Sequence, residues 1–233
     1  MHFVPGGSIR ALSSSTDTTH HPGPQHRMES PEAQEALTSH PLRSHDFTVR
    51  PARESDMPAL NAIHAHYVSN TVATFITTPL MDADFLAGYT SVRAADLPYL
   101  VAADAFNTPV GYAYVSPFRA AKAAYRQTVE FSLFCHPAHA GKGIGSALLQ
   151  RLLDVLRSPE EWAEDWIGEA WRGEDGRVRQ VIGVMALDEQ RKNGGWGLKE
   201  YYEGFGFEHA GTLKEVGRKF GKWIDTVYVQ LSL

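Results

Sequence analysis

The sequence predicts a mixed α/β domain whose helices cover both faces of a central sheet. Short segments in which apolar and polar residues alternate indicate strands, and longer segments with apolar residues three and four positions apart indicate helices. The two kinds of segment follow one another along the chain, with one long amphipathic helix among the strands, which is typical of an α/β sandwich. We assign residues 46–233 to this domain and expect residues 1–45 to form a disordered tail.

Local signals justify each element in turn. The segment Ser55-Asp56-Met57-Pro58 opens a helix, because cap-type residues precede an early proline. A turn at Asn107-Thr108 joins two strands, and the leucines of the longest helix lie on one face. Strands are predicted at residues 47–52, 99–105, 109–118, 128–137 and 178–187, and as two closing segments that end at Leu233. Helices are predicted at residues 57–70, 81–93, 143–157 and 198–205.

Residues 1–45 contain six of the eleven histidines and almost no apolar periodicity. Such a segment cannot bury enough apolar surface to offset its ordering entropy, so we expect disorder. It has no apolar core of about 7 to 15 residues, as a secretory signal would, and its acidic residues are unlike a mitochondrial presequence. Histidines scattered without a scaffold are typical of solvated residues, so we expect no metal site there.

The composition excludes several functional classes. The chain has 22 basic and 27 acidic side chains, a net charge of −5, which is unlike the basic footprint of proteins that bind nucleic acid or anionic membranes. No apolar run approaches the length of about 20 residues that a membrane helix needs. The single cysteine, Cys135, excludes an intramolecular disulfide and a cysteine-based zinc cluster. We therefore expect a soluble, cytoplasmic protein without a metal, nucleic-acid or membrane partner.

Residues 158–176 interrupt the α/β pattern with seven acidic side chains and three of the five tryptophans. Trp162 and Trp166 are four positions apart, so in a helix they share one face. We expect an inserted helix that lays these rings on the domain. A partner-docking or dimer surface is the alternative, because exposed aromatic patches often mark contacts.

The most informative segment runs from His139 to Ser146, where Gly141, Gly143 and Gly145 follow a strand and open a helix. Without Cβ atoms, this backbone can turn sharply and approach a ligand closely. The free amides and the positive end of the helix dipole suit a phosphate or pyrophosphate. The spacing differs from the P-loop and from the GxGxxG dinucleotide motif. A tight turn that binds nothing is the alternative.

Four further segments carry a resemblance to a known family: IHAHYVSNTVATF (63–75), VGYAYVSPFR (110–119), YRQTVEFSLFCHP (125–137) and VGRKFGKWIDTVYVQLSL (216–233). With the order strand, GKGIGSALL helix, strand and YYEGFGF, they resemble the acyl-CoA-dependent GNAT N-acetyltransferases, and within them the phosphinothricin acetyltransferase branch. The resemblance implies a mixed, mostly antiparallel sheet and transfer of acetyl from acetyl-CoA to a small amino-acid-like amine. It also implies a homodimer.

The resemblance places acetyl-CoA in a V-shaped gap beside the strand TVEFSLFC. The backbone of Leu133, Phe134 and Cys135 would pair with the pantetheine arm as an added strand does. The residues expected to hold the pyrophosphate are Gly141, Lys142, Gly143, Ile144, Gly145 and Ser146. At Ala140 the family usually carries Arg or Gln, so one phosphate-supporting side chain is missing. Asn193 is expected to hold the pantetheine arm, although it is displaced from the family spacing and a turn residue is the alternative.

Glu130 is the expected general base, because burial in an apolar strand raises a carboxyl pKa and the residue matches the glutamate of the branch's TVE motif. Tyr202 is the expected general acid, at a position where GNAT enzymes often place a tyrosine near the CoA sulfur. The branch commonly has histidine there, and Tyr201 is the competing phenol. The resemblance places the oxyanion near the amide of Phe134. A cysteine acyl-enzyme at Cys135 is disfavoured, because no His with Asp or Asn accompanies it.

Phe75, Arg119, Tyr125 and Arg126 lie in segments that resemble the branch's acceptor pocket. Arginine suits an acceptor with a carboxylate, because its planar fork matches oxyanions. Phosphinothricin, methionine sulfone or sulfoximine and ordinary amino acids are the candidate acceptors. Two alternatives stay open. One is a protein N-terminus, lysine or polyamine as acceptor, and the other is an acyl-CoA-binding module with weak or no catalysis.

Overall fold

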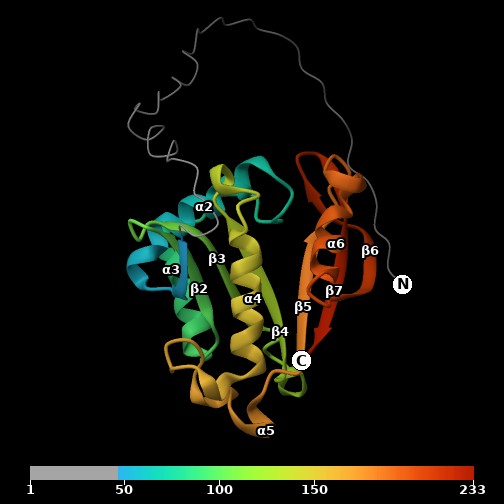
Figure 1. Ribbon diagram of the computed structural model, residues 1–233. Helices are drawn as coiled ribbons and strands as arrows, with labels where there is room; N and C mark the ends of the chain where they lie inside the picture. Colours follow the sequence, from blue (N-terminus) through green and yellow to red (C-terminus); the bar gives the residue numbers. More distant parts are fainter. Residues whose placement is uncertain (1–46) are drawn as a thin grey trace, which may run out of the picture. The chain divides into compact units, whose positions relative to one another are not determined.

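The computed structural model describes residues 47–233, so the tail predicted at residues 1–45 lies outside the described residues. The strands are β1 (Phe47–Pro51), β2 (Tyr99–Asp104), β3 (Pro109–Pro117), β4 (Thr128–Cys135), β5 (Gln180–Ala186), β6 (Glu208–Lys219) and β7 (Lys222–Ser232). The helices are α2 (Met57–Asn70), α3 (Asp82–Ala94), α4 (Ile144–Arg157), α5 (Gly173–Gly176) and α6 (Gly197–Glu203). The predicted strands are present, and so are the helices predicted outside the insertion (Figure 1). Within residues 47–233, no helix has the length and apolar character needed to cross a membrane.

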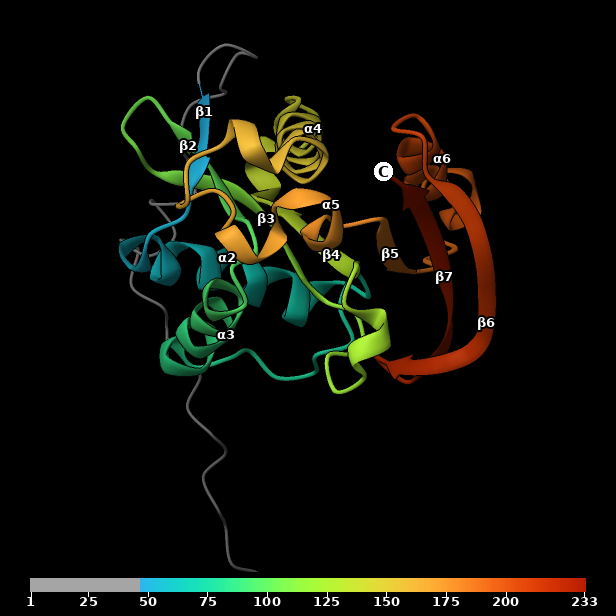
Figure 2. The ribbon, with the colours of Figure 1, turned by 90° about the horizontal axis from the view of Figure 1, so that it is seen from below.

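The strands form one seven-stranded sheet in the order β1-β2-β3-β4-β5-β7-β6. Neighbouring strands are antiparallel except for β4 and β5, which run parallel. Parallel neighbours need a crossover connection, and α4 lies in the one that joins β4 to β5. Helices α2 and α3 cover one face of the sheet, and α4 and α6 cover the other (Figure 2). The predicted mixed α/β architecture is therefore confirmed.

Helix α4 packs on the sheet through a stripe of leucines at helical spacing. Leu148, Leu149 and Leu152 have no exposed surface. The helix packs tightly on the sheet at Gly111 of β3, where an added Cβ would lie 3.0 Å from a methyl carbon of Ile144. The missing side chain at Gly111 thus lets the first turn of α4 lie directly against the sheet, beside the end of β4.

The parallel pair of β4 and β5 holds together over only part of its length. Thr128–Phe131 pairs with Gln180–Gly183, and the pairing then ends. Beyond this point β4 continues beside β3, and β5 continues beside β7. The two strands diverge at their carboxyl ends, which is where open α/β sheets bind ligands. This divergence agrees with the V-shaped gap that the resemblance implied.

The insertion at residues 158–176 forms three short helical turns instead of the single helix that we expected. These turns are Pro159–Glu161, Glu169–Trp171 and α5. One proline, Pro159, and three glycines lie in the segment and interrupt a continuous helix. Trp162 and Trp166 still meet, with ring centroids 4.7 Å apart, and both rings lie near the Arg151 guanidinium of α4, at 5.2 and 5.5 Å. The tryptophan pair is therefore packed against the domain.

Candidate active site

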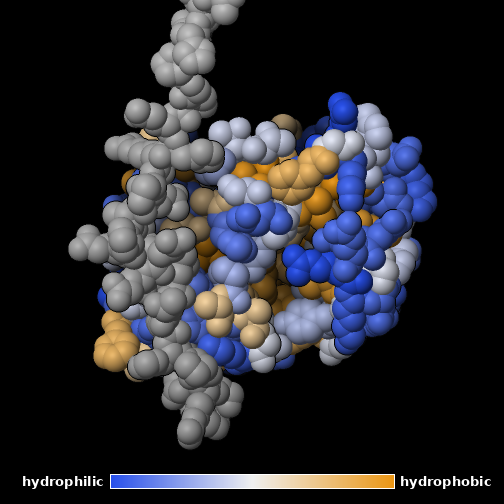
Figure 3. All heavy atoms as spheres, turned by 90° about the horizontal axis from the view of Figure 1, so that it is seen from above, coloured by the Kyte–Doolittle hydropathy of each residue, from blue (hydrophilic) through white to orange (hydrophobic). Residues whose placement is uncertain are grey.

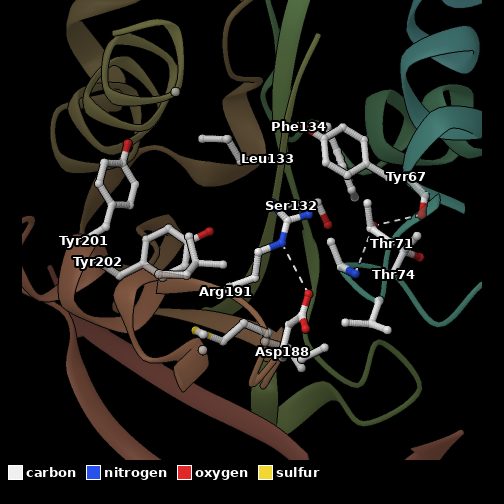
Figure 4. A pocket seen from close by; sticks show the side chains of 18 of the residues that line it. Tyr67, Thr71, Thr74, Ser132, Leu133, Phe134, Asp188, Arg191, Tyr201 and Tyr202 are labelled. Atoms are coloured by element: carbon white, nitrogen blue, oxygen red, sulfur yellow. Dashed lines mark hydrogen bonds and ion pairs between the residues drawn. The ribbon is translucent and has the colours of Figure 1, made fainter. Parts of the chain in front are cut away.

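A cavity of about 680 Å³ opens where β4 and β5 diverge. Its walls are β4, β5, the segment after α2, the loop between β5 and α6, and α6 itself (Figure 4). Figure 3, seen from the end at which α4 begins, shows apolar side chains in a hollow between polar rims. The predicted site residues that line the cavity are Phe75, Glu130, Leu133, Phe134, Cys135, Gly145 and Tyr202.

The edge of β4 presents backbone groups to this cavity. The His136 N–H donates to the Val110 carbonyl at 2.9 Å, and hydrogen bonds of a strand alternate between its two edges. The even-numbered residues of β4 therefore direct their backbone groups toward β3, and the odd-numbered ones direct theirs away from it. Leu133 and Cys135 thus present N–H groups to the gap. This corrects two expectations, that the Phe134 backbone pairs with the pantetheine arm and that its amide stabilises the oxyanion, because the backbone of Phe134 pairs with β3 and only its side chain lines the cavity.

The side chains of β4 alternate between two faces of the sheet. Glu130 and Phe134 share the face covered by α2, where the Tyr67 ring lies 5.2 Å from the Phe134 ring. Phe131 lies on the opposite face, and its ring centroid is 5.1 Å from that of Tyr202 in α6. The expected base and the expected acid, Glu130 and Tyr202, therefore reach the cavity from opposite faces of the sheet.

Glu130 is half-buried and lines the cavity. Its carboxyl group makes no hydrogen bond or ion pair with any residue of the described chain, and burial raises the pKa of that group. A carboxylate without a protein partner, beside a cavity and with a raised pKa, is suited to accept a proton from a bound amine.

Two adjacent tyrosines of α6 line the cavity in different surroundings. The Tyr201 hydroxyl lies 3.2 Å from the Ser146 hydroxyl in the first turn of α4, and Figure 4 shows it directed toward that helix. The Tyr202 ring packs against Phe131 and Phe207, and its hydroxyl has no hydrogen-bond partner among residues 47–233. Burial raises the pKa of Tyr202, so this phenol keeps its proton and is available to a ligand.

The glycine-rich turn before α4 provides open backbone. Gly141 and Gly143 have φ angles of 76° and 81°, and an added Cβ at either would meet nothing within 4 Å. The Ala147 N–H donates to the Gly143 carbonyl at 3.0 Å, so the amides that precede it are left without partners inside the helix. The Lys142 ammonium lies 3.2 Å from the His139 ring, on the same turn. These features together suit an anionic group such as a phosphate.

Three of the expected acceptor residues do not line the cavity. The Arg126 guanidinium donates to two backbone carbonyls of the insertion, at 2.7 and 2.8 Å, and so braces that segment. The Arg119 guanidinium lies over the Tyr125 ring, 5.9 Å from its centroid. Both arginines are therefore occupied at the protein surface, and Phe75 is the expected acceptor residue that the cavity contains.

Asn193 also lies outside the cavity lining. Its backbone adopts a left-handed conformation with φ of 55°, and its side-chain amide donates to the Glu200 carboxylate at 2.6 Å. These contacts match the alternative of a turn residue. Gly195, two positions further along, lines the cavity in its place.

Several residues that line the cavity were not expected from the sequence. Arg191 follows β5, and its Nε donates to the Asp188 carboxylate at 3.3 Å (Figure 4). Tyr67 of α2 donates its hydroxyl to the Cys135 carbonyl at 2.7 Å and so occupies the last acceptor on the β4 edge. Arg191 could have been expected at the site from its position in the sequence, because charged residues directly after a buried parallel strand lie where ligands bind.

The cavity lining of the described chain carries two acidic side chains, Glu130 and Asp188, and two basic ones, Arg191 and Lys192. The acidic insertion contributes none of them. Residues 47–233 contain no group of three or more His, Cys, Asp or Glu side chains arranged to hold a metal ion. The cavity therefore combines a balanced charge with an apolar interior.

Comparison with known proteins identifies similar sequences. The model of the acetyltransferase (GNAT) family matches residues 62–165. A phosphinothricin N-acetyltransferase of Alcaligenes faecalis is 37% identical over 186 residues, which cover 80% of this chain and 82% of that protein. An L-methionine sulfoximine/L-methionine sulfone acetyltransferase of Pseudomonas aeruginosa is 32% identical, with coverage of 80% and 94%.

Solved structures with the same fold include a GNAT superfamily phosphinothricin acetyltransferase from Sinorhizobium meliloti in complex with acetyl-CoA. It is 32% identical, covers 81% of this chain and 89% of its own, and superposes with a TM-score of 0.65. A putative acetyltransferase from Salmonella typhimurium with its cofactor acetyl-CoA is 27% identical, with coverage of 81% and 94% and a TM-score of 0.67.

Proposed function

The chain belongs to the GNAT acetyltransferase family, and on that premise we propose that it transfers acetyl from acetyl-CoA to the primary amine of a small amino-acid-like acceptor. The observation that carries the proposal is the cavity at the divergence of β4 and β5, with the Glu130 carboxyl group in its wall and without a partner among residues 47–233. The relatives named above act on phosphinothricin, methionine sulfoximine and methionine sulfone, so we take amino acids with a polar tail as the acceptor type.

The donor site fits the residues of this chain. The amides at the start of α4 and the Lys142 ammonium would hold the pyrophosphate, because the space beside Gly141 and Gly143 is open to a ligand. The edge of β4 would pair with the pantetheine arm through Leu133, as an added strand does. Bound acetyl-CoA supplies a thioester carbonyl that an amine can attack.

Glu130 would act as the general base. An acceptor amine is protonated in neutral water and must lose a proton before it can attack a carbonyl. The raised pKa of Glu130 makes its carboxylate a stronger base than an exposed glutamate. The N–H groups of Leu133 and Cys135 point into the same gap, and whichever of them the pantetheine arm leaves free would stabilise the oxyanion that develops.

Tyr202 would act as the general acid toward the departing sulfur. Its pKa is raised by burial, so the hydroxyl is protonated at neutral pH. It donates no hydrogen bond to any group within residues 47–233, so its proton is available to the sulfur. Tyr201 is the weaker candidate, because its hydroxyl already pairs with Ser146.

Direct transfer is favoured over an acyl-cysteine. Burial raises the pKa of Cys135 to about 11, so the thiol is almost wholly protonated at neutral pH. Reactive cysteines have the opposite property, a lowered pKa beside a base or a positive charge.

A polyamine or basic peptide acceptor is less well supported. The acidic insertion that would favour such an acceptor does not line the cavity. Because the cavity carries as many basic as acidic side chains, it suits an acceptor that has both an amine and an oxyanion.

We also propose that the protein is a cytoplasmic homodimer. Four large apolar side chains of the β6–β7 hairpin are exposed, namely Leu213, Val216, Phe220 and Trp223, which we call the hairpin patch. Several large exposed apolar side chains on one hairpin are in keeping with a contact surface. A free cysteine and a need for acetyl-CoA are in keeping with the cytoplasm.

Glu130→Gln is expected to lower kcat by about 100- to 10,000-fold on methionine sulfone or phosphinothricin, because the general base is lost. The measurement is CoA release with acetyl-CoA and a panel of these acceptors, standard amino acids and polyamines. In the wild type, kcat/KM should rise with pH through a pKa above that of an exposed glutamate, since the carboxylate is the active form.

The folded-state pKa of Glu130 is raised, so the wild-type protein loses stability as the pH rises through that pKa. Glu130→Gln removes this half-buried carboxylate, so at neutral pH the variant should unfold at the same temperature as the wild type or at a higher one. Affinity for acetyl-CoA should stay within about twofold. Full activity of Glu130→Gln would contradict the assignment of the base.

Tyr202→Phe is expected to lower kcat by about 100-fold with little loss of stability, because its hydroxyl bonds to no other residue in the described range. Tyr201→Phe is the matched control, since it removes one hydroxyl from the neighbouring ring. Single-turnover rates with saturating acetyl-CoA distinguish the two. A larger loss in Tyr201→Phe would reassign the acid.

Cys135→Ala should retain kcat within a few-fold, and intact-protein mass spectrometry of the wild type with acetyl-CoA alone should show no stable acetyl adduct at this residue. A thiol with a pKa of about 11 is a poor nucleophile at neutral pH. Loss of all turnover in a folded Cys135→Ala protein would contradict direct transfer and support an acyl-cysteine intermediate.

Replacing two members of the hairpin patch with charges, Val216→Glu with Trp223→Glu, should convert a dimer of about twice 25.8 kDa into a monomer, as measured by light scattering after gel filtration. Both side chains are more than half exposed in the protomer, so its folding should not suffer. Phe106→Glu is the matched control, because Phe106 is 91% exposed in a turn elsewhere. A wild type that elutes as a monomer would refute the homodimer.

A further inference from the structure

The cavity wall contains two positively charged side chains that differ in how well they suit the carboxylate of an acceptor. Arg191 and Lys192 are adjacent in the loop after β5, and within the described lining they are the positively charged side chains. An amino-acid acceptor carries a carboxylate on the same carbon as its amine. Its binding site therefore needs a positive group close to the base that receives the proton.

The Arg191 guanidinium is anchored at one end and open at the other. Its Nε donates to the Asp188 carboxylate at 3.3 Å, whereas its two Nη groups have no hydrogen-bond partner within residues 47–233. The side chain is 67% exposed, and its partner Asp188 is less so, at 28%. The pair of Nη groups forms the fork that binds a carboxylate through two parallel hydrogen bonds.

The guanidinium also lies on the correct side of β4. Figure 4 shows Arg191 extending from the loop into the cavity, between Asp188 and the residues of β4. The pKa of the Tyr67 hydroxyl, raised mainly by burial, is lowered in part by the positive charge of Arg191, so the two groups are near one another. Tyr67 covers the same face of β4 that carries Glu130.

The arginines expected from the sequence cannot take this role as they stand. Arg126 is held by carbonyl groups of the insertion, and Arg119 lies over Tyr125, and neither lines the cavity. Lys192 is a point charge without a fork, so it is less suited to a planar carboxylate.

We propose that Arg191 binds the α-carboxylate of the acceptor through its two Nη groups and thereby directs the amine toward Glu130, with Asp188 holding the guanidinium in place. This inference rests on the proposed function. It makes Arg191 the residue by which the enzyme distinguishes amino acids from simple amines.

The test compares three acceptors with and without Arg191. Methionine sulfone carries both the carboxylate and the polar tail, 3-(methylsulfonyl)propan-1-amine lacks the carboxylate, and norleucine lacks the sulfone. Arg191→Ala should lower kcat/KM about 10- to 100-fold for the two amino acids, as expected for a charged hydrogen-bonded pair, and change it less than about twofold for the simple amine. KM for acetyl-CoA should stay unchanged.

Lys192→Ala is the neighbouring comparison and should show no such selectivity. Arg53→Ala, an exposed arginine outside the cavity, controls for the change in net charge. Arg191→Lys should recover only part of the selectivity, because lysine lacks the fork.

Each other outcome overturns the inference in an identifiable way. Equal losses on all three acceptors, or a raised KM for acetyl-CoA, would show that Arg191 does not bind the acceptor carboxylate. The proposed function would be unaffected by that result. A loss that depends on the sulfone would assign Arg191 to the tail instead. A wild type without turnover on any amino-acid acceptor of the panel would overturn the proposed function, and this inference with it.

Discussion

Strands β4 and β5 pair through only four residue pairs, from Thr128–Gln180 to Phe131–Gly183, and the candidate active site lies beyond the last of them. Each strand stays fully paired on its outer side, β4 with β3 and β5 with β7. The inner edges are therefore left with backbone groups that need a partner, since unpaired backbone groups are costly when buried. A ligand that runs between the strands and supplies hydrogen bonds can be that partner.

Helix α4 depends on this same divergence. It begins next to the end of β4, and it can lie close to the sheet because Gly111 has no side chain there. The left-handed backbone at Gly143 turns the chain into the helix with its first amides uncovered. The glycine-rich turn and the strand edge are thus fixed relative to one another by packing in the core, which would give the proposed acetyl-CoA a rigid support.

The proposed chemical roles in the cavity depend on which polar groups have no hydrogen-bond or ion-pair partner within the described residues. The Glu130 carboxyl group has no partner within residues 47–233 and a raised pKa, whereas the Asp188 carboxylate accepts a hydrogen bond from Arg191. Tyr201 is committed to Ser146, whereas the Tyr202 hydroxyl has no partner within the described residues. The protein thereby separates neighbouring groups of the same chemical type into one that supports the structure and one that is available for reaction.

The sequence by itself determined the elements outside the insertion, the glycine-rich turn and the family, because periodicity, capping and motif spacing depend on residues close together in the chain. Tertiary structure alone decided other points. Phe134 turns its backbone away from the gap because the register between β3 and β4 sets the direction of each N–H. Arg126 is occupied by a carbonyl 44 residues away, and Arg191 reaches the cavity because the loop after β5 folds over it. A long polar side chain takes its role from the groups around it, and distant segments supply those groups only when the chain folds.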